Sequence, residues 1–416
     1  MLPALLFISF FPAALTSSSN NQAGAHSPNQ TAVAIGRLRS PNVAVRADAA
    51  EALARSPDRT ALPALVRAMD DPVASVRRQA VRAAAAAATV ADVHALIDAA
   101  SSGGPGRLRG VAEVLGILRS RAAAHWLAGL AANRNSRVRT AAVTALGEVG
   151  GAEALRAITA ALADRSAAVR LRAVDGVAEL GERGSARLLL PRLKDANRSV
   201  AIEAAVAIAR LGDRSVVPDL IRLEQEGSAS GPFGMQFYLA YALGNLGDKR
   251  ALPDLVRSLK NRDGFVRAQA AGALGALRDP RAEPALTVAL TDRFRLTRWA
   301  SAQALGRIAD RRAVAPLTRA MRDRSEDVRE QAAKALGRLR DSRAEPALAR
   351  GLFDSDDAVA RASVLALASI GDRRALPQLK LLVRSREPAV KQAAIYAVDA
   401  ILSKRRQTAA IQGNLK

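Results

Sequence analysis

The residues with the most regular spacing that could take part in chemistry are arginines, which recur at a period of 31 positions. They are Arg46, Arg77, Arg139, Arg170, Arg267, Arg298 and Arg329, with Lys391 in the last unit. A row of guanidinium groups could bind phosphates. However, Asp or Asn stands six positions before several of them, as Asp71 does before Arg77. Because carboxylates pair with guanidinium groups in a fixed planar geometry, this pattern predicts an internal ladder that ties helices and successive units together.

Metal and cofactor chemistry have few candidate ligands, because the chain has three histidines and no cysteine. His94 and His125 are 31 positions apart and occupy equivalent places in neighbouring units. Stacked helices lie about 8–10 Å apart, which is too far for two imidazoles to share a zinc ion at about 2 Å each. The glycines around Pro105 lack the Gly-Lys-Ser/Thr of a phosphate-binding loop. We therefore expect no metal, no cofactor and no enzymatic activity.

The elements that position these residues follow from a single repeat. The anchor positions of the repeat are Val45, Val76, Arg107, Val138, Val169, Val200, Met235, Val266, Thr297, Val328, Val359 and Val390. Their spacing is 31 residues, with one insertion of four between Val200 and Met235. Twelve units in register predict a solenoid, in which each unit buries its apolar face against its neighbours.

Each unit reads as two helices. Apolar residues 0, 4, 7, 8 and 11 positions after the anchor follow the helical period. Expected N-caps three positions before the anchor are Asn42, Asn135, Ser166, Asn197, Asp263, Ser325 and Asp356. Expected left-handed helix ends are Gly150, Gly181, Gly212, Gly247 and Gly371. A turn with Asp then leads to a shorter helix with Pro in its first turn, as Asp248 and Pro253 illustrate.

This pattern resembles the HEAT repeat over residues 31–403. More narrowly, Ala251-Leu252-Pro253-Asp254-Leu255 with Asp292 and Val328-Arg329 is similar to the short repeats of phycobilisome lyases. The resemblance implies an all-α, right-handed α-solenoid of about twelve two-helix repeats, and it leaves a lyase-like accessory role as one alternative function. The repeated His-Glu pairs of the HEAT-fold deoxyhypusine hydroxylase are absent.

The ends of the chain differ from the repeats. The first 36 residues contain no Lys, Arg, Asp or Glu, and an apolar run extends from Leu2 to Leu15. We interpret 1–25 as a signal peptide or a disordered leader, 26–30 as a linker and 404–416 as a basic C-terminal tail. The run is shorter than the roughly 20 residues of a membrane span. We therefore expect a secreted or periplasmic protein, otherwise a cytoplasmic one, without a membrane span.

The net charge of +23 favours polyanions in general. Yet the variable positions of the longer helix, which usually line the concave surface in HEAT-like solenoids, carry both signs. Acids such as Glu148 and Glu179 gather in units three to five, and bases in units nine and ten. A surface that follows a phosphate backbone should be basic throughout. Nucleic acid or another polyanion is thus an alternative partner that this pattern disfavours.

Aromatic residues mark one region of the chain. Beyond the leader there are ten, and seven of them fall between Phe233 and Trp299, next to the insertion. Aromatic side chains on a surface of small residues are typical of a binding site, although they could also fill a packing gap. We predict a monomeric scaffold that binds a protein partner through Phe237, Tyr238, Tyr241, Trp299, Arg307, Lys334 and Arg338.

Overall fold

The computed structural model describes residues 28–225 and 235–413, with side chains for 29–225 and 235–403. Within these ranges the chain forms 24 α-helices, short 3-10 turns and loops, and no β-strand. The helices alternate between short and long, in twelve pairs, which confirms the predicted α-solenoid. The handedness of the stack stays a prediction. The chain divides into two compact units, Met1–Leu130 and Ala131–Lys416.

The first unit contains seven helices in its described part. Its shorter helices, together with α1, are α1 (Pro28–Arg37), α3 (Leu62–Ala68), α5 (Val93–Ser101) and α7 (Ala124–Leu130). Its long helices are α2 (Val43–Arg55), α4 (Ala74–Ala87) and α6 (Pro105–Ile117). Because α1 begins at Pro28, the last residues of the expected linker are helical. The expected leader lies outside the described residues.

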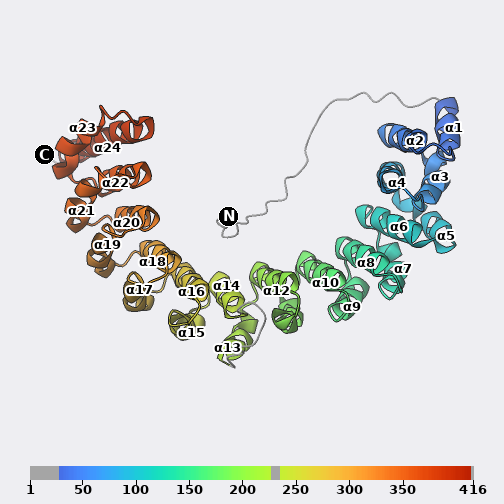
Figure 1. The fold of residues 1–416 in the computed structure, drawn as a ribbon, viewed down its shortest axis with the longest axis horizontal. Helices are drawn as coiled ribbons and strands as arrows, with labels where there is room; N and C mark the ends of the chain where they lie inside the picture. Colours follow the sequence, from blue (N-terminus) through green and yellow to red (C-terminus); the bar gives the residue numbers. More distant parts are fainter. Residues whose placement is uncertain (1–27, 226–234, 414–416) are drawn as a thin grey trace. The chain divides into compact units, whose positions relative to one another are not determined.

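The second unit contains the other 17 described helices. Its short helices are α9 (Ala152–Ala161), α11 (Ala186–Leu189), α13 (Val217–Gln225), α15 (Leu252–Ser258), α17 (Glu283–Ala289), α19 (Val314–Ala320), α21 (Glu345–Gly351) and α23 (Leu376–Leu382). Its long helices are α8 (Ser136–Val149), α10 (Ala167–Leu180), α12 (Arg198–Leu211), α14 (Met235–Leu246), α16 (Gly264–Leu277), α18 (Arg295–Ile308), α20 (Glu326–Leu339), α22 (Asp357–Ile370) and α24 (Pro388–Gly413). In this unit the long helices form an inner row and the short helices an outer row (Figure 1). The expected tail continues α24 as far as Gly413.

The beginnings of the long helices follow from side chains that accept backbone N–H groups. Asn42, Asn135, Asn197, Asp263 and Asp356 cap their helices as predicted. Ser166 and Ser325 stand in the same column but make no capping bond from the side chain. In these two repeats, as in most of those with a capping side chain, the Asp or Asn two positions earlier accepts the N–H of the cap residue: Asp164 accepts that of Ser166 at 2.7 Å, and Asp323 that of Ser325 at 2.9 Å.

Most of the long helices end on a residue with a positive φ angle, whether or not that residue is glycine. Helices α2 and α4 differ, because their end residues Ser56 and Ala88 have φ of −127° and −82°. The five predicted glycines have φ between 65° and 78°. The equivalent residues Arg119, Arg278, Ala309 and Arg340 also have positive φ, between 49° and 60°. In these repeats the turn into the next short helix therefore sets the backbone conformation of the end residue. Glycine at this position lowers the free-energy cost of the positive φ angle.

The core lies between the two rows of helices. Val138, Val169 and Val200 have no exposed surface, and alanines fill most of the space around them. Successive long helices approach closely where glycine recurs: a Cβ added at Gly275 would lie 2.7 Å from Cα of Ala304. Because these contacts involve backbone atoms, the sequence must keep small residues in this column.

Among the described residues, no single helix is both long and apolar enough to cross a membrane. One pair of segments, Ala74–Ala87 with Val90–Ser101, meets the length and composition criteria together, with a bend of 115° between them.

Candidate protein-binding surface

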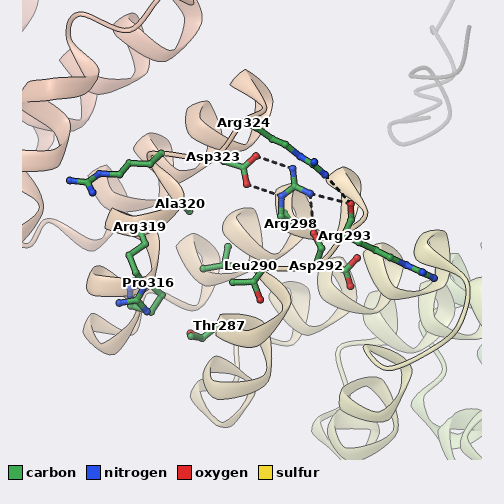
Figure 2. Close-up of a pocket in the computed structure, with 12 residues that line it drawn as sticks. Thr287, Leu290, Asp292, Arg293, Arg298, Pro316, Arg319, Ala320, Asp323 and Arg324 are labelled. Carbon is green, nitrogen blue, oxygen red and sulfur yellow. Dashed lines mark hydrogen bonds and ion pairs between the residues drawn. The ribbon is translucent and has the colours of Figure 1, made fainter.

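Six of the seven regular arginines form a ladder, as predicted, and Arg298 illustrates its geometry (Figure 2). The seventh, Arg77, donates to the backbone oxygens of Asp71 and Pro72 at 2.6 and 2.8 Å instead of to a carboxylate in the next repeat. Nε and Nη2 of Arg298 donate to the two carboxylate oxygens of Asp323 at 2.7 and 2.9 Å. Nη1 donates to the backbone oxygens of Asp292 and Arg293 at 2.9 and 3.4 Å. The carboxylate partner thus lies 25 positions after the arginine, in the next repeat, and the residue six positions before it contributes only its carbonyl group.

Six such pairs occur in the described residues, with closest distances of 2.6 or 2.7 Å. They are Arg46–Asp71, Arg139–Asp164, Arg170–Asp195, Arg267–Asp292, Arg298–Asp323 and Arg329–Asp354. In one of the repeats that lack the arginine, Asn261 donates instead to Gln236 at 2.7 Å. Burial alone would raise the pKa of Asp323, but the hydrogen bonds from Arg298 and from the N–H of Ser325 hold it below its usual value. These guanidinium groups are occupied inside the protein and do not form a phosphate-binding row.

A second set of ion pairs, which sequence reasoning missed, lies where the last five short helices begin. The aspartate of the turn accepts the N–H two positions later and also binds that residue's arginine side chain. The five pairs are Asp248–Arg250, Asp279–Arg281, Asp310–Arg312, Asp341–Arg343 and Asp372–Arg374. The signal for them was the repeated Asp-x-Arg, of which only the aspartate was interpreted.

The predicted aromatic residues divide into one buried and three partly exposed side chains. Tyr238 is 5% exposed, accepts a hydrogen bond from Nε of Arg198 at 3.2 Å and packs edge-on against Phe237 at 5.4 Å. Phe237, Tyr241 and Trp299 are half-buried. Tyr238 therefore belongs to the packing between α12 and α14, whereas the other three contribute to the accessible surface. Phe233 and the insertion lie outside the described residues.

The positions between these aromatic residues carry small side chains. Phe237 and Tyr241 on α14 occupy the same register positions as Trp299 and Gln303 on α18. On the intervening helix α16 those positions are Ala268 and Gly272, followed one turn later by Ala276. A Cβ added at Gly272 would meet no atom within 4 Å. On the inner row, α16 thus carries small side chains between α14 and α18, which carry large ones. We call these α16 positions, Ala268, Gly272 and Ala276, the low segment.

The predicted basic residues lie on the next helices of the same row. Lys334 and Arg338 on α20 are exposed, and Arg307 on α18 is half-buried. Burial lowers the pKa of Arg307, and the positive charges of Arg338 and Arg278 lower it further. Arg307 and Arg338 thus lie near each other although they come from neighbouring repeats.

A shallow groove of about 690 Å³ runs beside these basic residues, between α20 and α22. Its basic side chains are Lys334, Arg338, Arg340 and Arg361, and its single acid is Glu330. Lys334 pairs with Glu330 at 2.7 Å. A smaller hollow of about 500 Å³ lies beside the ladder pair Arg298–Asp323 (Figure 2).

The acidic residues of repeats three to five take part in interactions within the protein. Within the compact unit Met1–Leu130, Arg109 lies 3.4 Å from Glu113, whose pKa is raised by burial. In the second unit Arg172 binds Asp175 at 2.8 Å. Glu148 and Glu179 are also engaged in interactions. Glu203 on α12 extends this acidic region towards Tyr241, and its pKa is raised by burial and by Asp175.

The described residues contain no group of three or more His, Cys, Asp or Glu side chains that could hold a metal ion.

The chain matches the family described as HEAT repeats in seven overlapping segments. These segments are residues 31–116, 108–178, 156–231, 234–293, 259–336, 283–366 and 317–399. None of the curated proteins compared with the chain matches it. The narrower likeness to the repeats of phycobilisome lyases stays a prediction.

Solved structures with a similar fold include karyopherins. They are Kap95p with RanGDP (TM-score 0.67, 12% identity), a Kap121p mutant (0.63, 13%) and yeast importin-beta, Kap95p (0.62, 12%). The alignments cover 90%, 90% and 89% of this chain, which spans 62%, 49% and 60% of the respective chains. At this identity the likeness shows the fold alone. The repeated ladder, the twelve helix pairs and the matches over most of the sequence establish that this chain belongs to the HEAT-repeat family.

Proposed function

We propose that this protein is a non-enzymatic scaffold that binds a protein partner on the inner row of helices from α14 to α20. The observation that carries the proposal is the low segment at α16, which lies between Tyr241 on one side and Trp299 on the other. Half-exposed aromatic residues beside small ones give a partner a large contact area at a low cost in side-chain entropy.

Two further observations support a protein partner. HEAT-repeat stacks are long surfaces on which each repeat adds contact area. One solved structure of similar fold shows Kap121p bound to the extreme C-terminus of the protein phosphatase Cdc14p (TM-score 0.54, 12% identity). That complex concerns Kap121p, and we extend to the present chain only the idea that such a stack holds part of a protein.

The test combines Tyr241→Ala with Trp299→Ala in the full chain and measures capture of partners by crosslinking and affinity purification. We expect capture to fall at least about tenfold, because hot-spot aromatic residues dominate binding energy, while helical content by circular dichroism stays unchanged. The matched control is Phe353→Ala with Leu381→Ala, two residues that are 62% and 65% exposed outside the inner row. Equal capture by both double variants would contradict the proposed site.

A further inference from the structure

We propose that the groove between α20 and α22, with Arg307 beside it, binds an acidic segment of a protein partner that also carries an apolar side chain. This inference rests on the scaffold function proposed above and specifies the chemistry of the partner. Four observations support it. They are the absence of ion-pair partners for three arginines, the nearness of other positive charges to Arg307, the apolar residues that line the groove, and the charges of the neighbouring helices.

The first observation is that, whereas Lys334 pairs with Glu330, three arginines in or beside this groove differ from the arginines of the two sets of ion pairs. Those arginines each bind an aspartate of the protein, as Arg329 and Arg343 do at 2.7 Å. Arg307, Arg338 and Arg361 make no ion pair with any carboxylate in the part of the chain that the structure describes. Carboxylates from a partner could therefore bind them without breaking an internal pair.

The second observation is the crowding of these unpaired charges. A Cβ added at Gly306 on α18 would lie 3.3 Å from Nη1 of Arg338 on α20, which places this guanidinium group against the neighbouring helix. The depressed pKa of Arg307 reflects its burial and the repulsion from Arg338 and Arg278. Binding of carboxylates at this position would relieve the repulsion, so the free energy of binding gains from charges that are already held in place.

The third observation is the apolar part of the groove. Ala362 and Ala366 line it, and a Cβ added at Gly337 would lie 2.9 Å from Cα of Ala366, so the two helices are in close contact there. Leu365 stands beside them with 43% of its surface exposed. A ligand with carboxylates alone would leave Leu365 in water, whereas a segment with an apolar side chain among its acids would cover it.

The fourth observation distinguishes a short acidic segment from a long polyanion. Further along the same row the surface carries carboxylates among its basic groups, with Asp175 on α10 paired with Arg172, and Glu203 on α12 near Arg210. A nucleic acid that extended along the row would meet these carboxylates beyond the basic groove and be repelled. The distribution of charge therefore favours an acidic protein segment at the α18–α22 end.

The experiment measures binding of a fluorescein-labelled peptide of aspartate and glutamate residues with a central leucine to the full chain by fluorescence anisotropy. The test variant is Arg307→Glu, Arg338→Glu and Arg361→Glu. The matched control is Arg319→Glu, Arg322→Glu and Arg350→Glu, which changes net charge equally at exposed arginines away from the groove. We expect the test variant to bind at least about tenfold more weakly than wild type and the control to change by less than about threefold.

Two further binding measurements test whether the ligand needs an apolar side chain and whether it is a peptide or a nucleic acid. Replacing the central leucine of the peptide by glutamine, or Leu365 by Gln in the protein, should each weaken binding. A single-stranded oligothymidylate should bind less tightly than the peptide. If the charge-reversed chain loses helical content, Arg338→Gln with Arg361→Gln replaces it as the test variant.

The inference is overturned by no binding of the peptide to wild type, by equal losses in the test and control variants, or by tighter binding of the oligothymidylate. These outcomes can be distinguished from failure of the proposed scaffold function, which the Tyr241→Ala with Trp299→Ala variant tests. Capture that depends on Tyr241 and Trp299, combined with no effect of the charge reversal, would leave the scaffold function standing and remove only this groove from it.

Discussion

At the scale of single residues, the same side-chain type has different roles depending on what lies within reach. Arg298 is 5% exposed, and its guanidinium group donates four hydrogen bonds to acceptors from two repeats. Arg338 is exposed and its guanidinium group has no carboxylate partner among the described residues. The first links repeats and the second is available to a ligand, although both are arginines on long helices.

Asp323→Asn tests the ladder. The substitution keeps the size of the side chain but leaves the buried guanidinium group of Arg298 without its counter-charge, which should lower the free energy of unfolding by about 3 kcal/mol. The measurement is urea denaturation followed by circular dichroism. As a control, Asp327→Asn removes an exposed pair with Arg295 and should cost less than about 1 kcal/mol. Similar midpoints for the two variants would show that the ladder does not stabilise the stack.

The Asp-x-Arg turns predict a dependence of stability on pH. Hydrogen bonds from the Arg281 side chain and backbone lower the pKa of Asp279 from 3.8 to about 2, and Arg343 does the same for Asp341. Because the folded-state pKa values are depressed, these carboxylates stabilise the fold above pH 3.8, and this contribution is lost as the pH falls towards 2. Thermal unfolding between these pH values should show a smaller decline for Asp279→Asn with Asp341→Asn than for wild type. A parallel decline in both proteins would contradict this assignment.

At the scale of elements, the helix ends show how tertiary geometry overrides local preference. Ala309 ends α18 with φ 60° and ψ 32°, a conformation that glycine supplies at the end of α22. Alanine adopts it because the next short helix must pack against α18, and the strain of one residue costs less than the loss of that packing.

Ala309→Gly should therefore stabilise the protein. Relief of the left-handed strain outweighs the greater chain entropy of glycine in the unfolded state, and the net gain is about 0.5–1 kcal/mol. The midpoint of urea unfolding reports the change. Ala276→Gly, at an exposed helical position of α16, is the matched control and should destabilise by about 0.5–1 kcal/mol. A loss of stability in Ala309→Gly would contradict the role of backbone strain.

At the scale of the whole molecule, the repeat makes most positions equivalent, and function is expected where equivalence fails. Positions that build the stack are alike in every unit, whereas the accessible positions of the inner row change from acidic on α10 and α12 to aromatic on α14 and basic on α18 and α20. A partner that contacts several repeats would need charges and apolar groups in the complementary order.

The compartment of the protein belongs to the same scale. We propose that the chain is exported, because its uncharged first 36 residues contain an apolar run followed by Ala23-Gly24-Ala25. Sequencing the N-terminus of protein purified from its native source should find His26 as the first residue. A native chain that retains Leu2 to Leu15 would contradict export by a cleaved signal.

The sequence by itself determined the period, the two helices of each repeat, the buried valine and alanine columns and the proline and aspartate positions, because each depends on local geometry that recurs every 31 residues. The tertiary structure decided which carboxylate each ladder arginine binds, that Tyr238 is buried, and that Arg307, Arg338 and Leu365 gather near one groove. These facts depend on how consecutive repeats pack side by side, and a residue's distance along the chain does not reveal which neighbour in the next repeat it reaches.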